Sequence, residues 1–271
     1  MDPSFLIFWI LPNECVLAWQ LKFDGGILVG MVFIQLFSFF YKQIRHRALH
    51  YFRRQLERKN QLTHIEDAID FGDRALIRLD KWLGFLLFSF RSAPKLKTML
   101  YDLAFPSPLI SASFKSDMPI LTIWLKLGLG AVTIKTIMAD KRPGNSKPRI
   151  QEVMVDGQPA LINAMGLPGP GVDGLLKEFE RSQLMKWDRP IGFSVGGNTL
   201  DEYCDVFERL ESSLNAMPSV TPFYEFNISC PNVPGEKNFD LTTSFVSELL
   251  GRVRASSQAV VGIKLSPDFS D

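Results

Sequence analysis

From residue 109 onward, short apolar runs rich in β-branched residues alternate with segments of helical periodicity. This alternation constrains the fold most, because strand–helix–strand units pair their strands in parallel. We predict strands over residues 108–112, 131–137, 191–195, 223–229 and 259–265. We predict helices over residues 119–128, 172–182, 199–214 and 244–255.

The pattern predicts an α/β fold, either a barrel or a doubly wound sheet. No G-x-G-x-x-G motif opens a helix after the first strand, which argues against a dinucleotide-binding sheet.

Two local signals support these boundaries. The pair Asp156-Gly157 is typical of a tight turn and predicts a β-hairpin around it. Thr199, with Glu202 three residues later, has the spacing of a capping box and predicts the start of a helix.

The N-terminal part, residues 1–98, differs in composition from the rest. Residues 26–41 carry no charge, and the basic stretch 42–59 follows at once. An apolar segment with Lys and Arg on its C-terminal side indicates a membrane anchor with those residues in the cytoplasm. Its sixteen residues fall just short of the about 17–25 that a spanning helix needs. The alternative is a buried helix hairpin that caps a soluble core.

Charge and cysteine content narrow the class of protein. The formal net charge is +1, so nothing in the charge balance indicates nucleic-acid binding. Cys15, Cys204 and Cys230 are widely spaced, match no zinc motif and offer no disulfide framework. We predict no metal site, and structural roles for Cys15 and Cys204.

Polar side chains cluster where the predicted strands end. In a parallel barrel, chemistry is located at the C-terminal ends of the strands. Asn offers donors and acceptors to a planar ligand, Cys can act as a base, and Lys supplies positive charge. Together they predict a site for a flat, polar, partly anionic molecule, formed by Lys135, Thr136, Ser194, Asn227, Cys230 and Lys264.

Four ordered motifs carry a family resemblance. "FNISCPNVPG" resembles the central signature of the dihydroorotate dehydrogenases, flavin enzymes of pyrimidine synthesis. "AVTIKTI…RPGNSKPR", "INAMGLPGPGVD" and "VVGIKLSPDFSD" resemble further family segments in the same order. The resemblance covers about residues 100–271 and implies an FMN-containing (β/α)8 TIM-type barrel over residues 99–271. It implies an oxidoreductase of the CH–CH class that oxidises dihydroorotate to orotate in de novo UMP synthesis.

The resemblance also implies roles for single residues. Cys230 matches the base that removes the C5 proton of dihydroorotate while C6 delivers a hydride to the flavin. The residues that match substrate-binding positions are Lys135, Asn163, Asn227 and Asn232. Lys264 matches the lysine that stabilises negative charge on the reduced flavin. The positions that match FMN contacts are Ala112, Ser113, Lys135, Thr136, Asn227 and Lys264.

The electron acceptor and location follow less directly. The Cys base and "SCPNVPG" resemble the soluble class 1 enzymes, which use fumarate, or NAD through a partner subunit. The hydrophobic N-terminal extension resembles the membrane-bound class 2 enzymes, which use quinone. We predict a membrane-associated protein with its catalytic domain on the cytoplasmic side, a membrane-linked acceptor such as quinone, and a homodimer.

Three departures from the family pattern matter. "SASFKSDM" lacks the family's glycine and shifts its lysine, so Lys115 matches no family residue. Ser194 stands where many class 2 members have an asparagine that contacts FMN. A complete eight-fold barrel runs to about 250 residues, and residues 99–271 predict only the first half to two-thirds of one. We therefore expect a fragment of a longer protein, which would hold FMN weakly.

Two other functions remain open at this point. One is a related flavin enzyme of the dihydropyrimidine dehydrogenase type, whose motif is similar. The other is a non-catalytic, membrane-associated homologue with a decayed half-barrel.

Overall fold

The computed structural model describes residues 8–9, 26–58, 65–88, 90, 92–228 and 243–265. The chain divides into two compact units. The first comprises residues 1–75 and 146–165, and the second comprises residues 76–145 and 166–271. The predicted boundary at residue 98 stays a prediction.

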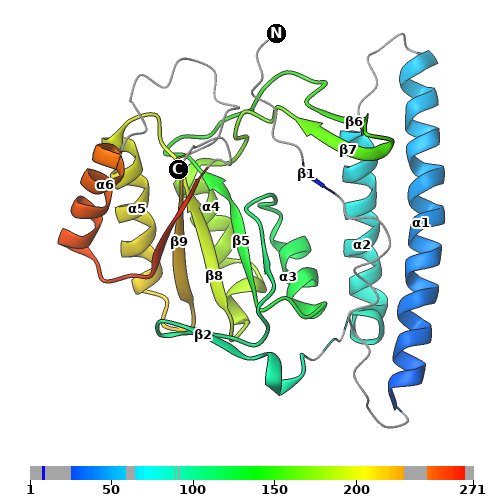
Figure 1. Cartoon of the computed structure of the whole chain (residues 1–271), viewed down its shortest axis with the longest axis horizontal. Helices are drawn as coiled ribbons and strands as arrows, with labels where there is room; N and C mark the ends of the chain where they lie inside the picture. The colour runs from blue at the N-terminus through cyan, green and yellow to red at the C-terminus, as the bar shows by residue number, and fades with distance from the viewer. Residues whose placement is uncertain are drawn as a thin grey trace. The chain divides into compact units, whose positions relative to one another are not determined.

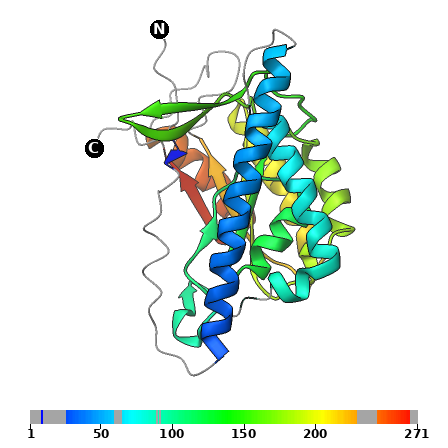
Figure 2. The ribbon, with the colours of Figure 1, turned by 90° about the vertical axis from the view of Figure 1, so that its right-hand side faces the viewer.

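The first unit combines helices with a β-hairpin. Helix α1 (Gly26–Arg58) is continuous through the apolar and the basic stretch, and the first part of α2 (Glu66–Leu87) lies beside it (Figure 2). Phe52 of α1 and Phe71 of α2 pack with ring centroids 5.9 Å apart. The hairpin consists of β6 (Ile150–Val155) and β7 (Gln158–Asn163), with the short β1 (Phe8–Trp9) paired to β7.

The hairpin turn lies where the sequence predicted it. Asp156 and Gly157 both have positive φ angles, 50° and 75°. Such a pair matches the twist of the two flanking strands, which is why Asp-Gly is favoured in two-residue hairpin turns.

Ion pairs connect this hairpin to the two helices. Arg149, just before β6, donates from Nη2 to Oε1 of Glu66 at 2.6 Å, and its Nε also reaches this carboxylate. The hydrogen bond with Glu66 raises the pKa of the Arg149 guanidinium. Lys147 pairs with Asp67 at 3.1 Å, and Arg53 of α1 pairs with Glu152 of β6 at 3.1 Å. These ion pairs add to the burial of Ile150 and Ala160 in joining the hairpin to the helices.

The predicted membrane anchor, residues 26–41, forms the first half of α1. Within the described ranges, no helix combines the length and the apolar character needed to cross a membrane.

The second unit is built on a five-stranded parallel sheet in the order β10-β9-β8-β5-β4 (Figure 1). Its strands are β4 (Ile110–Ser111), β5 (Ala131–Ile137), β8 (Pro190–Val195), β9 (Thr221–Asn227) and β10 (Val261–Lys264). Each strand lies beside the one that precedes it among these five, with no reversal of order. A doubly wound sheet would reverse its order, whereas a barrel does not. The predicted α/β fold, a part of a TIM-type barrel, is confirmed.

Helices alternate with the strands as predicted. They are α3 (Met118–Lys126), α4 (Gly171–Glu180), α5 (Leu200–Asn215) and α6 (Thr243–Ser256). The short elements are η2 (Pro94–Leu96), β2 (Thr98–Leu100), β3 (Leu103–Phe105) and η3 (Leu184–Lys186). Thr199 caps α5 by accepting a hydrogen bond from the backbone N–H of Glu202 at 3.2 Å, which confirms the predicted start of this helix.

An aromatic core joins these helices to one face of the sheet. Phe179 of α4 packs on Phe193 of β8 with ring centroids 5.4 Å apart, and Phe207 of α5 packs on Tyr224 of β9 at 4.9 Å. All four rings are buried. Because side chains alternate along a strand, the residues next to Phe193 on β8 and next to Tyr224 on β9 point to the other face of the sheet.

That other face is concave. Ser113, just after β4, and Lys264, on β10, belong to the two opposite edges of the sheet, yet Lys264 Nζ donates to Ser113 Oγ at 2.9 Å. In a flat sheet the two edge strands would lie four spacings, or about 19 Å, apart. The contact requires the sheet to curl as the wall of a barrel does.

Candidate functional site

The candidate site lies on the concave face, at the C-terminal ends of the strands. Glu225 and Asn227 of β9 alternate with Tyr224 and Phe226, whose rings pack against Phe207 of α5. The two polar side chains therefore face away from the helices. Asn227 is directly in register with Lys264 of β10, and Glu225 with Ser194 of β8.

Asn227 is fixed on two sides. Its Nδ2 donates to Oγ1 of Thr136 at 2.8 Å, and the hydroxyl of Tyr203 donates to its backbone oxygen at 2.8 Å. The side-chain oxygen Oδ1 is buried, and no atom of the described residues donates to it. A buried acceptor without a donor costs about 1–3 kcal/mol, so this oxygen is well suited to receive an N–H group from a ligand.

Thr136 and Ser194 continue the polar surface across the sheet. Their hydroxyl oxygens lie 3.1 Å apart, within hydrogen-bonding distance, and Ser194 Oγ donates to Oε1 of Glu225 at 3.0 Å. The pairing of β5 with β8 is irregular between Ile134 and Ile137. Such irregularities redirect side chains near the ends of strands, and Lys135 and Thr136 both lie within this one.

Glu225 connects the polar residues of this network, and it was not among the site residues predicted from the sequence. Its Oε1 also accepts from Ser113 Oγ at 2.9 Å and lies 3.2 Å from Lys264 Nζ. The signal was present in the sequence. Glu225 is two residues before Asn227, hence on the same face of the strand, and a carboxylate within an apolar strand needs a partner.

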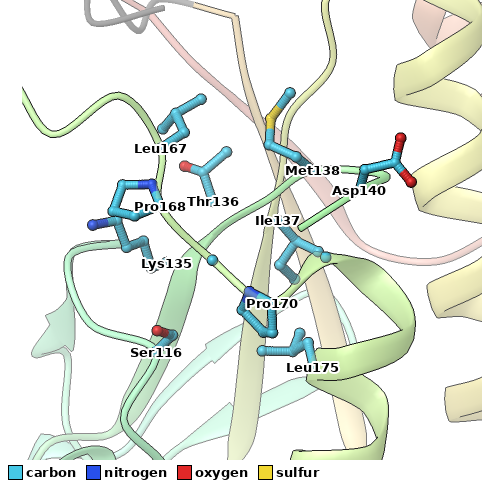
Figure 3. Close-up of a pocket in the computed structure, with 12 residues that line it drawn as sticks. Ser116, Lys135, Thr136, Ile137, Met138, Asp140, Leu167, Pro168, Pro170 and Leu175 are labelled. Atoms are coloured by element: carbon cyan, nitrogen blue, oxygen red, sulfur yellow. The ribbon is translucent and has the colours of Figure 1, made fainter. Parts of the chain in front are cut away.

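Lys135 lines a pocket beside this network (Figure 3). The pocket lies between the end of β5 and the loop before α4, and Thr136 also lines it. Loop residues Leu167 and Pro168 form the wall near Lys135. The backbone N–H of Lys135 donates to the carbonyl of Lys115 at 2.9 Å.

The structure thus brings together five of the predicted site residues, Ser113, Thr136, Ser194, Asn227 and Lys264. Lys135 lines the adjacent pocket, and Ala112 directly precedes Ser113. Asn163 ends β7, in the first unit. Cys230 and Asn232 lie outside the described residues. Within the described ranges, no group of three or more His, Cys, Asp or Glu side chains could hold a metal ion.

The N-terminal ends of the strands carry a different kind of polar group. Arg189, just before β8, donates to the backbone oxygens of Leu125, in the last turn of α3, and of Leu129, in the loop after it, and it lies 5.1 Å from the Trp187 ring. Burial lowers the pKa of the Arg189 guanidinium. This residue satisfies helix carbonyls, a stabilising role typical of that end of a barrel.

The residues at the C-terminal ends fit FMN, the cofactor that the resemblance implies. The flavin ring offers an N–H donor flanked by carbonyl oxygens. This N–H group can donate to Asn227 Oδ1, which accepts no hydrogen bond from the described residues. Lys264, whose side chain is 38% exposed, carries its ammonium group on the same face and suits a ring that gains negative charge on reduction. A buried acceptor and an accessible cation on one concave wall are the features that such a ring requires.

Known proteins resemble this chain in sequence and in fold. The catalytic subunit of dihydroorotate dehydrogenase B (NAD(+)) from Desulforudis audaxviator is 38% identical over 53% of this chain and 44% of that protein. The dihydroorotate dehydrogenase (quinone) of Thermus thermophilus is 29% identical over 65% of this chain and 51% of that protein. The chain thus spans about half the length of these curated relatives.

A solved structure agrees in fold. The DHODH of Eimeria tenella, in complex with ferulenol, superposes with a TM-score of 0.55 at 18% identity and covers 74% of this chain and 60% of that one. The family described as dihydroorotate dehydrogenase matches residues 95–271. Because this match covers more than half of the chain, the protein belongs to the dihydroorotate dehydrogenase family.

Proposed function

We propose that this protein takes part in the FMN-dependent oxidation of dihydroorotate to orotate, a step of de novo pyrimidine synthesis. Family membership supports the reaction class. The single observation that carries the proposal is the buried Oδ1 of Asn227, which no described donor reaches, at the strand end that leads into the family's signature motif.

Some of the proposed residues contact FMN, and others act on dihydroorotate. The Oδ1 atom of Asn227 accepts a hydrogen bond from an N–H group of the ligand, and Thr136 keeps the Asn227 amide from rotating by accepting from Nδ2. Lys264 offers positive charge from β10. Cys230 is proposed to take the C5 proton of dihydroorotate, and bound FMN would accept the hydride from C6. Lys135, Asn163 and Asn232 remain predicted substrate residues.

A flavin spectrum tests this function. The purified full chain, supplied with FMN, is expected to show the yellow absorbance of a bound flavin, and dihydroorotate should bleach it in the absence of air. The Cys230→Ala variant should bind FMN and bleach far more slowly. Cys204→Ala is the matched control, because that thiol is buried on α5. Equal bleaching in wild type and Cys230→Ala would remove Cys230 from its proposed role.

Ligand preference separates the alternatives. A dihydroorotate enzyme should bind orotate more tightly than uracil, because orotate carries the carboxylate that a lysine such as Lys135 can pair with. Tighter binding of uracil would favour the dihydropyrimidine dehydrogenase type. A protein that binds neither FMN nor a pyrimidine, even when any downstream sequence is restored, would be a non-catalytic homologue.

For the electron acceptor we propose a quinone at a membrane surface, with the catalytic unit on the cytoplasmic side. One relative is named as a quinone enzyme. Near the end of α2, Trp82 is 81% exposed and Phe85 78% exposed, an arrangement that suits contact with lipid. A homodimer remains part of the proposal, and light scattering would measure it.

Surface substitutions test the acceptor more cleanly than a truncation. The double variant Trp82→Ser, Phe85→Ser should lose quinone reduction and binding to anionic vesicles but keep reduction of a soluble dye. The control is Lys95→Ser, which alters an exposed residue outside α2. Unchanged quinone reduction in the double variant would contradict a membrane-linked acceptor at this surface.

A further inference from the structure

Glu225 places a negative charge beside Lys264, the residue whose positive charge the proposed function requires. Its Oε1 lies 3.2 Å from Lys264 Nζ and accepts hydrogen bonds from Ser113 at 2.9 Å and Ser194 at 3.0 Å. We propose that Glu225 is a positioning residue, which holds the Lys264 ammonium on the concave wall and offsets part of its charge toward the bound cofactor. This inference rests on the proposed function, because it concerns the lysine assigned to the flavin.

The geometry makes Glu225 the connecting residue of the wall. One carboxylate oxygen receives donors from the segment after β4, from β8 and from β10, while Glu225 itself belongs to β9. Lys264 also donates to Ser113, so its ammonium is held between a carboxylate and a hydroxyl. A long, flexible side chain that is held at two points has a defined position before any ligand arrives.

The charge has a direct consequence for a ring that becomes negative on reduction. Lys264 stabilises the reduced form, and the carboxylate beside it opposes that effect because both ionised groups act through the same short distance. Removing the negative charge while keeping the lysine should favour the reduced form. The sign is therefore fixed: loss of the Glu225 charge raises the flavin midpoint potential.

Two substitutions separate position from charge. Glu225→Gln keeps the length and an acceptor oxygen for the two serine hydroxyls but loses the charge. Glu225→Asp keeps the charge but withdraws the carboxylate by one methylene. The control is Glu178→Gln, an exposed position on α4 outside the site.

The first measurement needs no cofactor. The folded 271-residue proteins are treated briefly with an amine-acylating reagent, and modification of each lysine is read by mass spectrometry. Lys126, paired with Asp80 at 2.6 Å, is the reference within each sample. Modification of Lys264 relative to Lys126 should rise about threefold in both Glu225 variants, the factor expected for loss of a partly exposed ion pair. It should not change in Glu178→Gln.

The second measurement is the midpoint potential of bound FMN. In Glu225→Gln the preference for reduced over oxidised FMN should rise about tenfold, a positive shift of about 30 mV for a two-electron couple. In Glu225→Asp the potential should stay near the wild-type value, because the charge remains.

The outcomes are distinct. Unchanged Lys264 modification in both variants would overturn the positioning role, and an unchanged or lowered potential in Glu225→Gln would overturn the charge role. Failure of the wild-type chain to bind FMN would instead overturn the proposed function, and the modification result would still decide whether Glu225 holds Lys264. If Glu225→Gln does not fold, Glu225→Asp alone decides the positioning role.

Discussion

The two units of this protein are stabilised by different forces. In the second unit, buried aromatic and aliphatic side chains cover one face of a parallel sheet, and polar groups gather on the other. In the first unit, the hairpin is held to the helices by pairs such as Arg149–Glu66 and Arg53–Glu152. The contrast teaches that the sheet unit is built on a large apolar core, whereas in the first unit ion pairs between distant parts of the chain supplement a few buried side chains such as Ile150 and Ala160.

The largest expected effect tests the apolar side of this comparison. Phe193→Ala empties a fully buried position that contacts Phe179 and Tyr224. Unfolding free energy from urea titration should fall by about 3–5 kcal/mol, because a large cavity remains. Phe85→Ala, at a position 78% exposed, should change it by less than about 0.5 kcal/mol. Similar losses in both variants would contradict a core-dominated sheet.

The next effect tests the charged side. Glu66→Gln leaves the half-enclosed Arg149 guanidinium without its carboxylate, a local loss of about 2 kcal/mol. Amide hydrogen exchange over residues 150–163 should accelerate about 30-fold, while exchange in β8 and β9 stays unchanged. Glu57→Gln, an exposed change on α1, is the control. No acceleration at the hairpin would show that backbone pairing alone holds it.

An intermediate effect concerns pH and the sheet unit. Burial raises the pKa of the Cys204 thiol above its ordinary value of 9.0. The folded state therefore keeps its proton at pH values where the unfolded chain has lost it. The stability that this thiol contributes is complete well below the ordinary pKa of 9.0 and is lost as the pH rises above that value.

Urea unfolding at about pH 8, 9 and 10 measures this loss. Stability should decline with a slope of at most about 1.4 kcal/mol per pH unit from this group. In Cys204→Ala the decline over this range should be shallower by that contribution. An identical slope in the variant would show that the thiol does not titrate differently on folding.

The smallest effect sharpens the comparison between the units. Raising the salt concentration screens exposed ion pairs, and Arg53 and Glu152 have side chains 49% and 27% exposed. Hydrogen exchange in the hairpin should accelerate about twofold in high salt, with little change at the buried strands of the sheet. Equal acceleration in both units would remove the distinction.

The strands were predictable because the physics that forms them is local. The run 131–137 is β5 to the residue, since its β-branched side chains are buried on both faces of a parallel sheet. The hairpin turn and the cap of α5 were predictable for the same reason, as Asp156-Gly157 and Thr199 act through their own backbone neighbourhood. The sequence divided α1 into an apolar and a basic part, but nothing between them breaks a helix, and one helix formed.

The pairings that organise the site and the hairpin were not predictable in this way. Glu225 meets Ser113, 112 residues away, and Arg149 meets Glu66, 83 residues away. Which charged side chains meet depends on strand order and on sheet curvature, and neither is encoded in a short window of sequence. The family motif includes Asn227 but not Glu225, whose partners Ser113, Ser194 and Lys264 come from other parts of the sheet.

The hydrogen bond between Lys264 and Ser113 affects how the curled sheet can receive a ligand. It joins β10, the last strand of the curved sheet, to the segment that follows β4, and both side chains also contact Glu225 Oε1. A ring that settles on this wall must share these polar atoms or displace them. Ligand binding and the curvature of the sheet then depend on the same hydrogen bond. A variant that weakens the Lys264–Ser113 bond should therefore alter both the fit of the ligand and the shape of the wall that receives it.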